Sequence, residues 1–175
     1  MIRAMYPGTF DPVHSGHLDL MKRAAVIFDE LVVAVYDHSK PTKSILFSAQ
    51  ERVHMIETAL DSTDNIIVAV FSGLAVDFAH EMNVRVFVRG LRVFSDFEFE
   101  FRLALANKRL APEIETISLI TDEEHSFLSG TTVREISSLG GDVSSMVPPN
   151  VAEALYQRFN GHGSKEFNRP VPLRD

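Results

Sequence analysis

Cysteine is absent from the 175 residues of this chain. Disulfide bonds, thiolate metal sites and cysteine nucleophiles are therefore excluded, and we expect a reducing, cytoplasmic setting. Long apolar runs are absent as well, because the purest of them, such as 66–71, are far too short to span a bilayer. No basic stretch followed by a long apolar one opens the chain, so we expect a protein that is neither exported by a Sec-type signal nor embedded in a membrane.

A surplus of positive charge is also lacking. Lysine and arginine total 17 against 24 aspartate and glutamate residues, which gives a formal net charge of −7. Proteins that neutralise many nucleic-acid phosphates display a broad basic face, so we expect no nucleic-acid partner. A single polyphosphate ligand, by contrast, requires only local cations.

Two common nucleotide-binding motifs are missing: the Gly-x-Gly-x-x-Gly fingerprint and the lysine-containing phosphate loop. Their absence argues against a dehydrogenase and against a P-loop enzyme. The composition, 45% hydrophobic and 23% charged, suits one compact domain with a sizeable core. We assign this domain to residues 1–159. Residues 160–175, which are rich in Gly, Pro and charge, are expected to form a flexible tail.

Apolar runs and helical patterns alternate along the chain. β-branched runs without polar interruption are typical of parallel strands covered on both faces. We therefore predict an α/β fold: a single-domain, doubly wound, five-stranded parallel sheet of Rossmann-like type. The strands are expected at Ile2–Tyr6, Leu31–Tyr36, Asn65–Phe71, Val84–Val88 and Glu115–Ile120, and the helices from Gly16 to about Phe28, Ser48 to about Leu60, Leu74 to Met82, Phe94 to Leu110, Gly130 onward, and Pro148 to about Phe159.

Residues 94–110 fit two patterns. Phenylalanine and leucine alternate with charged residues from 97 to 105, which on its own favours a strand. The stretch has no Val, Ile or Thr and is rich in Leu, Ala, Glu, Arg and Lys, so we predict a helix. Such a helix is apolar on more than one side. Its second face either meets a partner subunit or is deeply buried.

The segment Y-P-G-T-F-D-P-V-H-S-G-H, residues 6–17, joins the first strand to the first helix. Pro7-Gly8 is expected to end the strand, and the N-terminus of the helix offers backbone N–H groups that favour an anion. His17 would lie against that anion. The alternative is that His14 and His17 are ordinary residues of a first helical turn.

Further ligand-type residues follow other predicted strands. Lys40 and Lys43 come after the second strand, and Arg89 and Arg92 surround a glycine after the fourth. Near the fifth, Thr132 and Glu135 have capping-box spacing at the start of a helix. Each of these has an ordinary alternative: solvated loop lysines, surface arginines or a simple helix cap. Because parallel strands place their carboxyl ends at one edge, we expect a phosphate site there.

Four strings carry a resemblance to a known family: the 6–17 segment, P-T-K-S-I-L-F-S-A-Q-E-R-V, V-R-G-L-R-V-F-S-D-F-E-F-E and H-S-F-L-S-G-T-T-V-R-E. Together they resemble the bacterial phosphopantetheine adenylyltransferases of the H-x-G-H nucleotidyltransferase superfamily, and the match runs from about residue 3 to 159. The resemblance implies transfer of AMP from ATP to 4′-phosphopantetheine in coenzyme A biosynthesis, Mg²⁺ bound with ATP, a cytoplasmic homohexamer and feedback binding of coenzyme A.

The same resemblance implies residue roles. His17, Lys43 and Arg92 would be catalytic, and no residue would form a protein-only metal site. The acceptor would be held by Thr9, Lys43, Ala75 and Arg89. The ATP site would consist of Thr9, Phe10, His17, Gly90, Leu91, Arg92, Glu100, His125, Ser126, Phe127, Leu128, Ser129, Gly130 and Thr131.

The chain departs from the family pattern in three places. His125 replaces a usual aromatic residue, Gly130 replaces a usual serine, and the loop before Lys43 is about two residues longer than common, which leaves Lys40 as a competitor. Two other functions remain open. Nicotinamide mononucleotide adenylyltransferases and cytidylyltransferases share the H-x-G-H element, although R-G-L-R and D-F-E-F-E favour the pantetheine branch. A protein that binds ATP without turnover is the non-enzymatic alternative.

Overall fold

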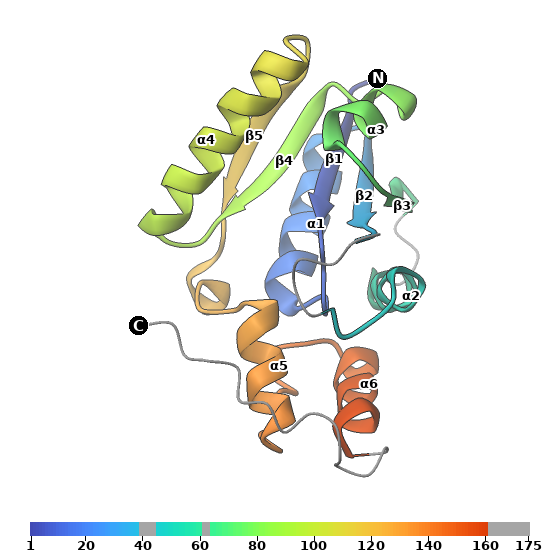
Figure 1. Ribbon diagram of the computed structural model, residues 1–175, viewed down its shortest axis with the longest axis vertical. Coiled ribbons are helices and arrows are strands. Elements are labelled where there is room, and N and C mark those ends of the chain that lie inside the picture. Colours follow the sequence, from blue (N-terminus) through green and yellow to red (C-terminus); the bar gives the residue numbers. More distant parts are fainter. Residues whose placement is uncertain (39–44, 61–63, 161–175) are drawn as a thin grey trace.

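The computed structural model describes residues 1–38, 45–60 and 64–160. The predictions for Lys40, Lys43 and the tail beyond Asn160 lie outside these residues. The sheet has five strands in the order β3-β2-β1-β4-β5, and every neighbouring pair is parallel (Figure 1). This confirms the predicted doubly wound α/β fold.

The elements alternate as the sequence predicts, and the ambiguous segment 94–110 is a helix. None of the helices in the described part is long and apolar enough to cross a membrane. The strands are β1 (Arg3–Gly8), β2 (Glu30–Tyr36), β3 (Ile66–Phe71), β4 (Val86–Leu91) and β5 (Glu115–Ile120); the helices are α1 (Ser15–Ile27), α2 (Ala49–Leu60), α3 (Ala75–Glu81), α4 (Phe94–Leu110), α5 (Gly130–Ser138) and α6 (Pro149–Asn160), with a short 3₁₀ turn η1 (Glu123–His125).

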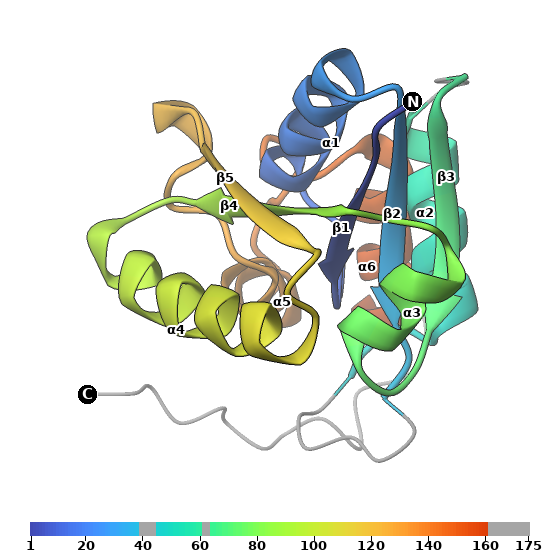
Figure 2. The same cartoon turned by 90° about the horizontal axis from the view of Figure 1, so that it is seen from above.

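Helices cover both faces of the sheet. Figure 2 shows α1 on one face and α3 and α4 on the other. Along β1, Ala4 and Tyr6 belong to the core cluster beneath α1 and α2, while Met5 points into the second cluster beneath α3. The strands are therefore buried on both sides, which explains their continuous apolar runs. Helices α5 and α6 lie beyond the carboxyl ends of the strands (Figure 1).

Two strand ends differ from the prediction. β1 does not stop at Tyr6 but continues through Pro7 and Gly8, which pair with β2. On its other side, β1 pairs with β4 only at Ala4 and Met5. Because the backbone of β4 is not paired with Pro7, the missing proline N–H costs no strand-to-strand hydrogen bond there. β4 likewise runs on to Leu91, so Arg89 lies within the strand rather than after it.

The helix starts are capped by residues that the sequence identifies only in part. The predicted box at the start of α2 is confirmed, because Ser48 N donates to Glu51 Oε2 (2.7 Å) and Glu51 N donates to Ser48 Oγ (3.3 Å). The predicted role of Thr132 with Glu135 is wrong. Ser129 caps α5 by accepting a hydrogen bond from Thr132 N at 3.1 Å. Ser129 directly precedes the first residue of α5, Gly130, so Thr132 is already the third residue of the helix.

Candidate active site

A cavity of about 600 Å³ opens at the carboxyl edge of the sheet. It extends from the loop after β1 to the first turns of α3 and α5. Four predicted residues, Leu91, Ser126, Phe127 and Leu128, are not part of its wall, and Lys43 lies outside the described residues. The predicted residues that do line it are Thr9, Phe10, His17, Ala75, Arg89, Gly90, Arg92, Glu100, His125, Ser129, Gly130 and Thr131.

The cavity exists because β1 and β4 separate. Their last paired residues are Met5 and Phe87, although each strand continues for several residues. In open α/β sheets, ligands bind at the point where the strand order reverses, and here that point lies between β1 and β4. Arg89 spans the gap, since its Nη1 donates to the carbonyl of Pro7 at 2.9 Å.

Arg89 is fixed by a carboxylate across the cavity wall. Its Nε and Nη2 donate to the two oxygens of Glu100 on α4, each at 2.7 Å. Burial opposes the charged form, but the hydrogen bonds and the charge of Glu100 raise the pKa of Arg89. The guanidinium is therefore fully charged and held in one plane. Glu100, expected in the ATP site, contacts Arg89 directly.

Arg92 joins two other parts of the wall. Its Nε donates to Asp96 Oδ2 at 3.0 Å, and its Nη1 donates to the carbonyl of Leu128 at 2.6 Å. The first partner lies in the first turn of α4 and the second in the loop before α5. The side chain of Leu128 is buried, so only its carbonyl reaches the site. Arg92 thus holds the 125–131 loop near β4.

The two histidines of the H-x-G-H element form a reciprocal cap on α1. His14 Nδ1 accepts a hydrogen bond from His17 N, and His17 Nδ1 accepts one from His14 N, both at 3.3 Å. The imidazole rings stack with their centroids 3.5 Å apart. Because a backbone N–H can only donate, both Nδ1 atoms must be acceptors in the neutral rings. Each ring then carries its proton on Nε2.

Burial keeps these imidazoles uncharged. Desolvation, followed by the charges of Arg92 and His125, lowers the pKa of His14 to about 3. Desolvation, followed by His14, Arg92 and Arg89, lowers the pKa of His17 well below its usual value of 6.5. A base with so low a pKa removes protons poorly near pH 7. His17 is better suited to donate a hydrogen bond from Nε2.

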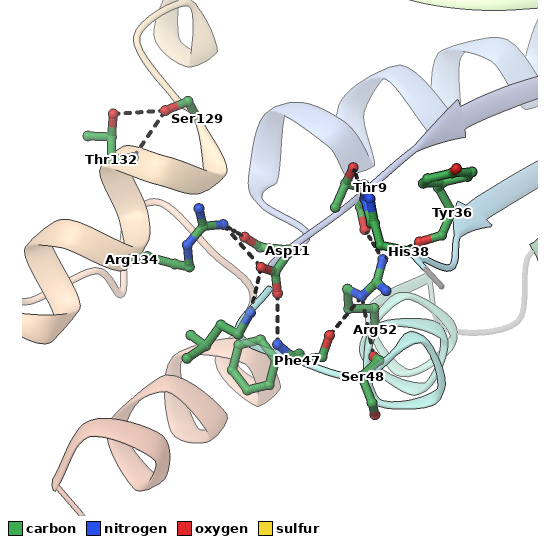
Figure 3. A network of polar contacts seen from close by, with 11 residues as sticks. Thr9, Asp11, Tyr36, His38, Phe47, Ser48, Arg52, Ser129, Thr132 and Arg134 are labelled. Atoms are coloured by element: carbon green, nitrogen blue, oxygen red, sulfur yellow. Dashed lines mark hydrogen bonds and ion pairs between the residues drawn. The ribbon is translucent and has the colours of Figure 1, made fainter. Parts of the chain in front are cut away.

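Asp11 connects three segments beneath the cavity (Figure 3). Its carboxylate accepts hydrogen bonds from Leu46 N (2.8 Å) and Phe47 N (2.9 Å). On the other side, Arg134 Nη1 of α5 lies 3.2 Å from Asp11 Oδ2 and also donates to the Asp11 carbonyl. The Thr9 loop, the start of α2 and the start of α5 are therefore tied to one buried side chain.

Gly130 is explained by the same contact. A Cβ atom at this position would lie 2.9 Å from the carbonyl oxygen of Asp11, which is backbone and cannot simply rotate away. A serine, the usual residue in the resembling family, would therefore force the Thr9 loop or α5 to shift. The glycine allows α5 to approach Asp11 closely, with Arg134 bridging the two.

Four residues of the site are not predicted from the sequence. Asp11, Arg134 and Arg52 act through buried polar contacts with distant segments, and no local pattern marks such contacts. Thr121, at the end of β5, lines the cavity, and its Oγ1 is the one buried side-chain polar atom without a hydrogen-bond partner in the described part of the chain. The S-A-Q-E-R string could have drawn attention to Arg52, but not to its burial.

Comparisons with known proteins agree with this geometry. The cytidylyltransferase-like family model matches residues 5–136. A phosphopantetheine adenylyltransferase from Dictyoglomus thermophilum is 47% identical over 159 residues, which cover 91% of this chain and 96% of that protein. Another protein of that name, from Methylacidiphilum infernorum, is 48% identical over 175 residues and covers 99% of this chain and 98% of its own length.

A solved structure shows the same fold at much lower identity. It is assigned as a nicotinate-nucleotide adenylyltransferase from Vibrio parahaemolyticus and superposes with a TM-score of 0.66 at 17% identity. The superposition covers 89% of this chain and 99% of that one.

The protonation of the histidine pair can be measured by ¹⁵N NMR. In the ligand-free protein both rings should be Nε2–H tautomers, and neither should titrate between about pH 8 and about pH 5, where an ordinary histidine changes charge. Unfolded histidines take up protons below about pH 6.5 while the buried pair resists. The free energy of unfolding should therefore fall as the pH drops from about 6.5 toward 3. An Nδ1–H tautomer, or titration near pH 6.5, would contradict this assignment.

Proposed function

This chain belongs to the phosphopantetheine adenylyltransferase family of cytidylyltransferase-like proteins, and we propose that it transfers AMP from ATP to 4′-phosphopantetheine in the cytoplasm. The products are dephospho-coenzyme A and pyrophosphate, an intermediate and a by-product of coenzyme A biosynthesis. One observation carries the proposal: a single cavity at the switch point of the sheet brings together His17, Arg89 and Arg92 around the Thr9 loop.

The reaction is a displacement at phosphorus. A phosphate oxygen of the acceptor attacks the α-phosphorus of ATP, a new P–O bond forms, and the bond to the bridging oxygen of pyrophosphate breaks with its electron pair. A phosphate monoester is already anionic near neutral pH, so no proton has to be removed from the nucleophile. Positioning and charge stabilisation then supply most of the catalysis.

His17, Arg89 and Arg92 fit this requirement. Nε2–H of His17 would donate to the α-phosphate as its charge rearranges, and Arg92 would bind the triphosphate. Arg89 would hold the acceptor phosphate, whose charge otherwise repels that of ATP. Tyr6 is unsuitable as a base, because burial raises the pKa of its phenol to about 12.

The other substrate-binding residues that the family resemblance implies are also part of the proposal. Thr9 would contact both phosphates and Ala75 would line the acceptor side, since both residues line the cavity. Lys43 is included on the sequence resemblance alone. The ATP ligands would be those residues of the predicted set that line the cavity, joined by the 125–131 loop. Binding of coenzyme A at the same cavity would be the simplest form of feedback, because it shares the pantetheine chain.

We propose Mg²⁺ only as an ion that ATP brings with it, bound to its phosphates. Among the described residues, no group of three or more His, Asp or Glu side chains is arranged to hold a metal ion. Magnesium bound to the phosphates of ATP would screen their charge.

The proposal is tested by measuring pyrophosphate release from ATP with a set of acceptors. 4′-Phosphopantetheine should support turnover well above the acceptor-free control. Unphosphorylated pantetheine should not react, because both the nucleophile and its anchoring charge are missing. Nicotinamide mononucleotide as the better acceptor would overturn the branch assignment. ATP binding without turnover on any acceptor would identify a nucleotide-binding protein instead.

We also infer that α4 and β5 form a subunit interface. Helix α4 covers one face of the sheet and exposes large apolar side chains along its length, and Ile120 at the end of β5 points to the same face of the sheet (Figure 2). An apolar surface of this extent marks a protein–protein contact. The exposed residues are Phe97 (51%), Phe101 (53%), Leu105 (57%), Leu110 (59%) and Ile120 (73%). Phe99 lines the cavity instead, and Ile117 points to the face of the sheet that α1 covers.

Light scattering tests the assembly. The chain has a mass of 19.6 kDa, and the family resemblance leads us to expect a particle of about six copies. Leu105→Glu should reduce the mass, because it places a charge in the proposed contact. Val26→Glu is the matched control, since Val26 is 88% exposed on α1, on the opposite face of the sheet. A wild-type monomer at micromolar concentration, or equal effects of both changes, would count against this interface.

A further inference from the structure

Arg52 of α2 is the largest fully buried side chain in the described part of the protein, at 1% exposure. No carboxylate of the described residues forms an ion pair with it. Removing an arginine from water is costly unless its donors are satisfied. Desolvation lowers the pKa of Arg52, opposed by the charges of Asp11 and Asp37. A leucine or methionine at this site would avoid that cost, so the guanidinium has another purpose.

The hydrogen bonds of Arg52 identify this purpose (Figure 3). Its Nη1 donates to two carbonyls, that of Thr9 at 2.5 Å and that of Tyr36 at 2.9 Å. Its Nε donates to the carbonyls of Phe47 at 3.0 Å and Ser48 at 3.3 Å. One planar group therefore joins the loop after β1, the last residue of β2 and the start of α2.

Two of the four carbonyls, those of Thr9 and Tyr36, belong to residues that line the cavity on the proposed acceptor side. Thr9 follows β1, and its hydroxyl lies 3.3 Å from Nε2 of His38, just beyond β2. Tyr36 and Phe47 flank, in sequence, the segment that contains Lys43. Of the elements proposed to bind ATP, only the Thr9 loop, which would contact both substrates, is reached by these four hydrogen bonds; none goes to α1, β4, α4, α5 or the 125–131 loop. A defect at Arg52 should thus affect the two substrates unequally.

We propose that Arg52 is a positioning residue for the acceptor phosphate. It sets the separation between the Thr9 loop and the end of β2, and thereby the place at which the acceptor phosphate is held against the α-phosphate of ATP. The role depends on the planar fork of the guanidinium, since one nitrogen bridges two carbonyls while another holds the start of α2. The inference rests on the proposed function, because the acceptor is defined there.

Two substitutions separate geometry from charge. Arg52→Lys keeps the positive charge but loses the fork, and Arg52→Gln keeps two donors but loses the charge. If the fork positions Thr9, both variants should raise the KM for 4′-phosphopantetheine about tenfold or more and lower kcat. The kcat/KM of the lysine variant should exceed that of the glutamine variant by no more than about twofold, because the retained charge does not replace the fork. The KM for ATP should change less than about threefold.

Arg158→Gln is the matched control. Arg158 also contacts the start of α2, because its guanidinium lies 4.9 Å above the ring of Phe47 and pairs with Glu51. It makes no hydrogen bond to Thr9 or Tyr36 among the contacts of the described residues. Its loss should therefore leave both KM values unchanged. A change in acceptor KM equal to that of the Arg52 variants would show that any loosening of α2 suffices, and would overturn the proposal.

Turnover of the wild-type protein is measured first, so that a failure of the proposed function can be distinguished from a failure of the positioning role of Arg52. No acceptor-dependent turnover in wild type would reject the proposed function itself. Turnover in wild type with unchanged acceptor KM in both Arg52 variants would reject the positioning role alone. The dissociation constant for ATP, measured by calorimetry, checks that each variant is folded. A parallel loss of ATP binding and acceptor binding would assign Arg52 to stability only and would also overturn the proposal.

Discussion

The site depends on how the loop between β1 and α1 is held in place. This loop lies along the cavity, where β4 has already separated from β1, so no neighbouring strand fixes its backbone. Asp11 meets this need by accepting two backbone hydrogen bonds from the start of α2 and by pairing with Arg134 of α5. Arg52 holds the same loop from the other side through the Thr9 carbonyl. Breaking such a buried pair from one side would leave an uncompensated charge, so these contacts act together.

Arg89 and Arg92, which line the cavity, are already paired before a substrate arrives. Glu100 orients Arg89, and Asp96 orients Arg92. Each pairing lowers the electrostatic attraction available to a phosphate, but it also fixes the donors in place, so that little reorganisation accompanies the reaction. The neutral His14 and His17 pair is also oriented in advance, because the reciprocal cap fixes Nδ1 of each ring as an acceptor and so leaves the proton on Nε2.

Much of this could be predicted from the sequence. The alternation of apolar runs and helical patterns predicted the parallel sheet. The amino-acid composition of residues 94–110 correctly predicted a helix there. The ends of β1 and β4 could not be predicted, because Pro7 is tolerated only where the neighbouring strand has separated, and that separation is a property of the whole sheet. Motif residues such as His17 and Arg92 stood out. Their supports did not, because Asp11 and Arg52 are defined by contacts 35 to 43 positions away.

In the proposed mechanism, pre-oriented donors drive the transfer without a general base. Measuring kcat and the ATP dissociation constant of His17→Ala tests this mechanism, with the melting temperature as a check on folding. Loss of the Nε2–H donor should lower kcat by on the order of 100-fold or more while ATP affinity changes only a few-fold, because the hydrogen bond strengthens in the transition state. A folded variant with near-normal kcat would contradict this mechanism.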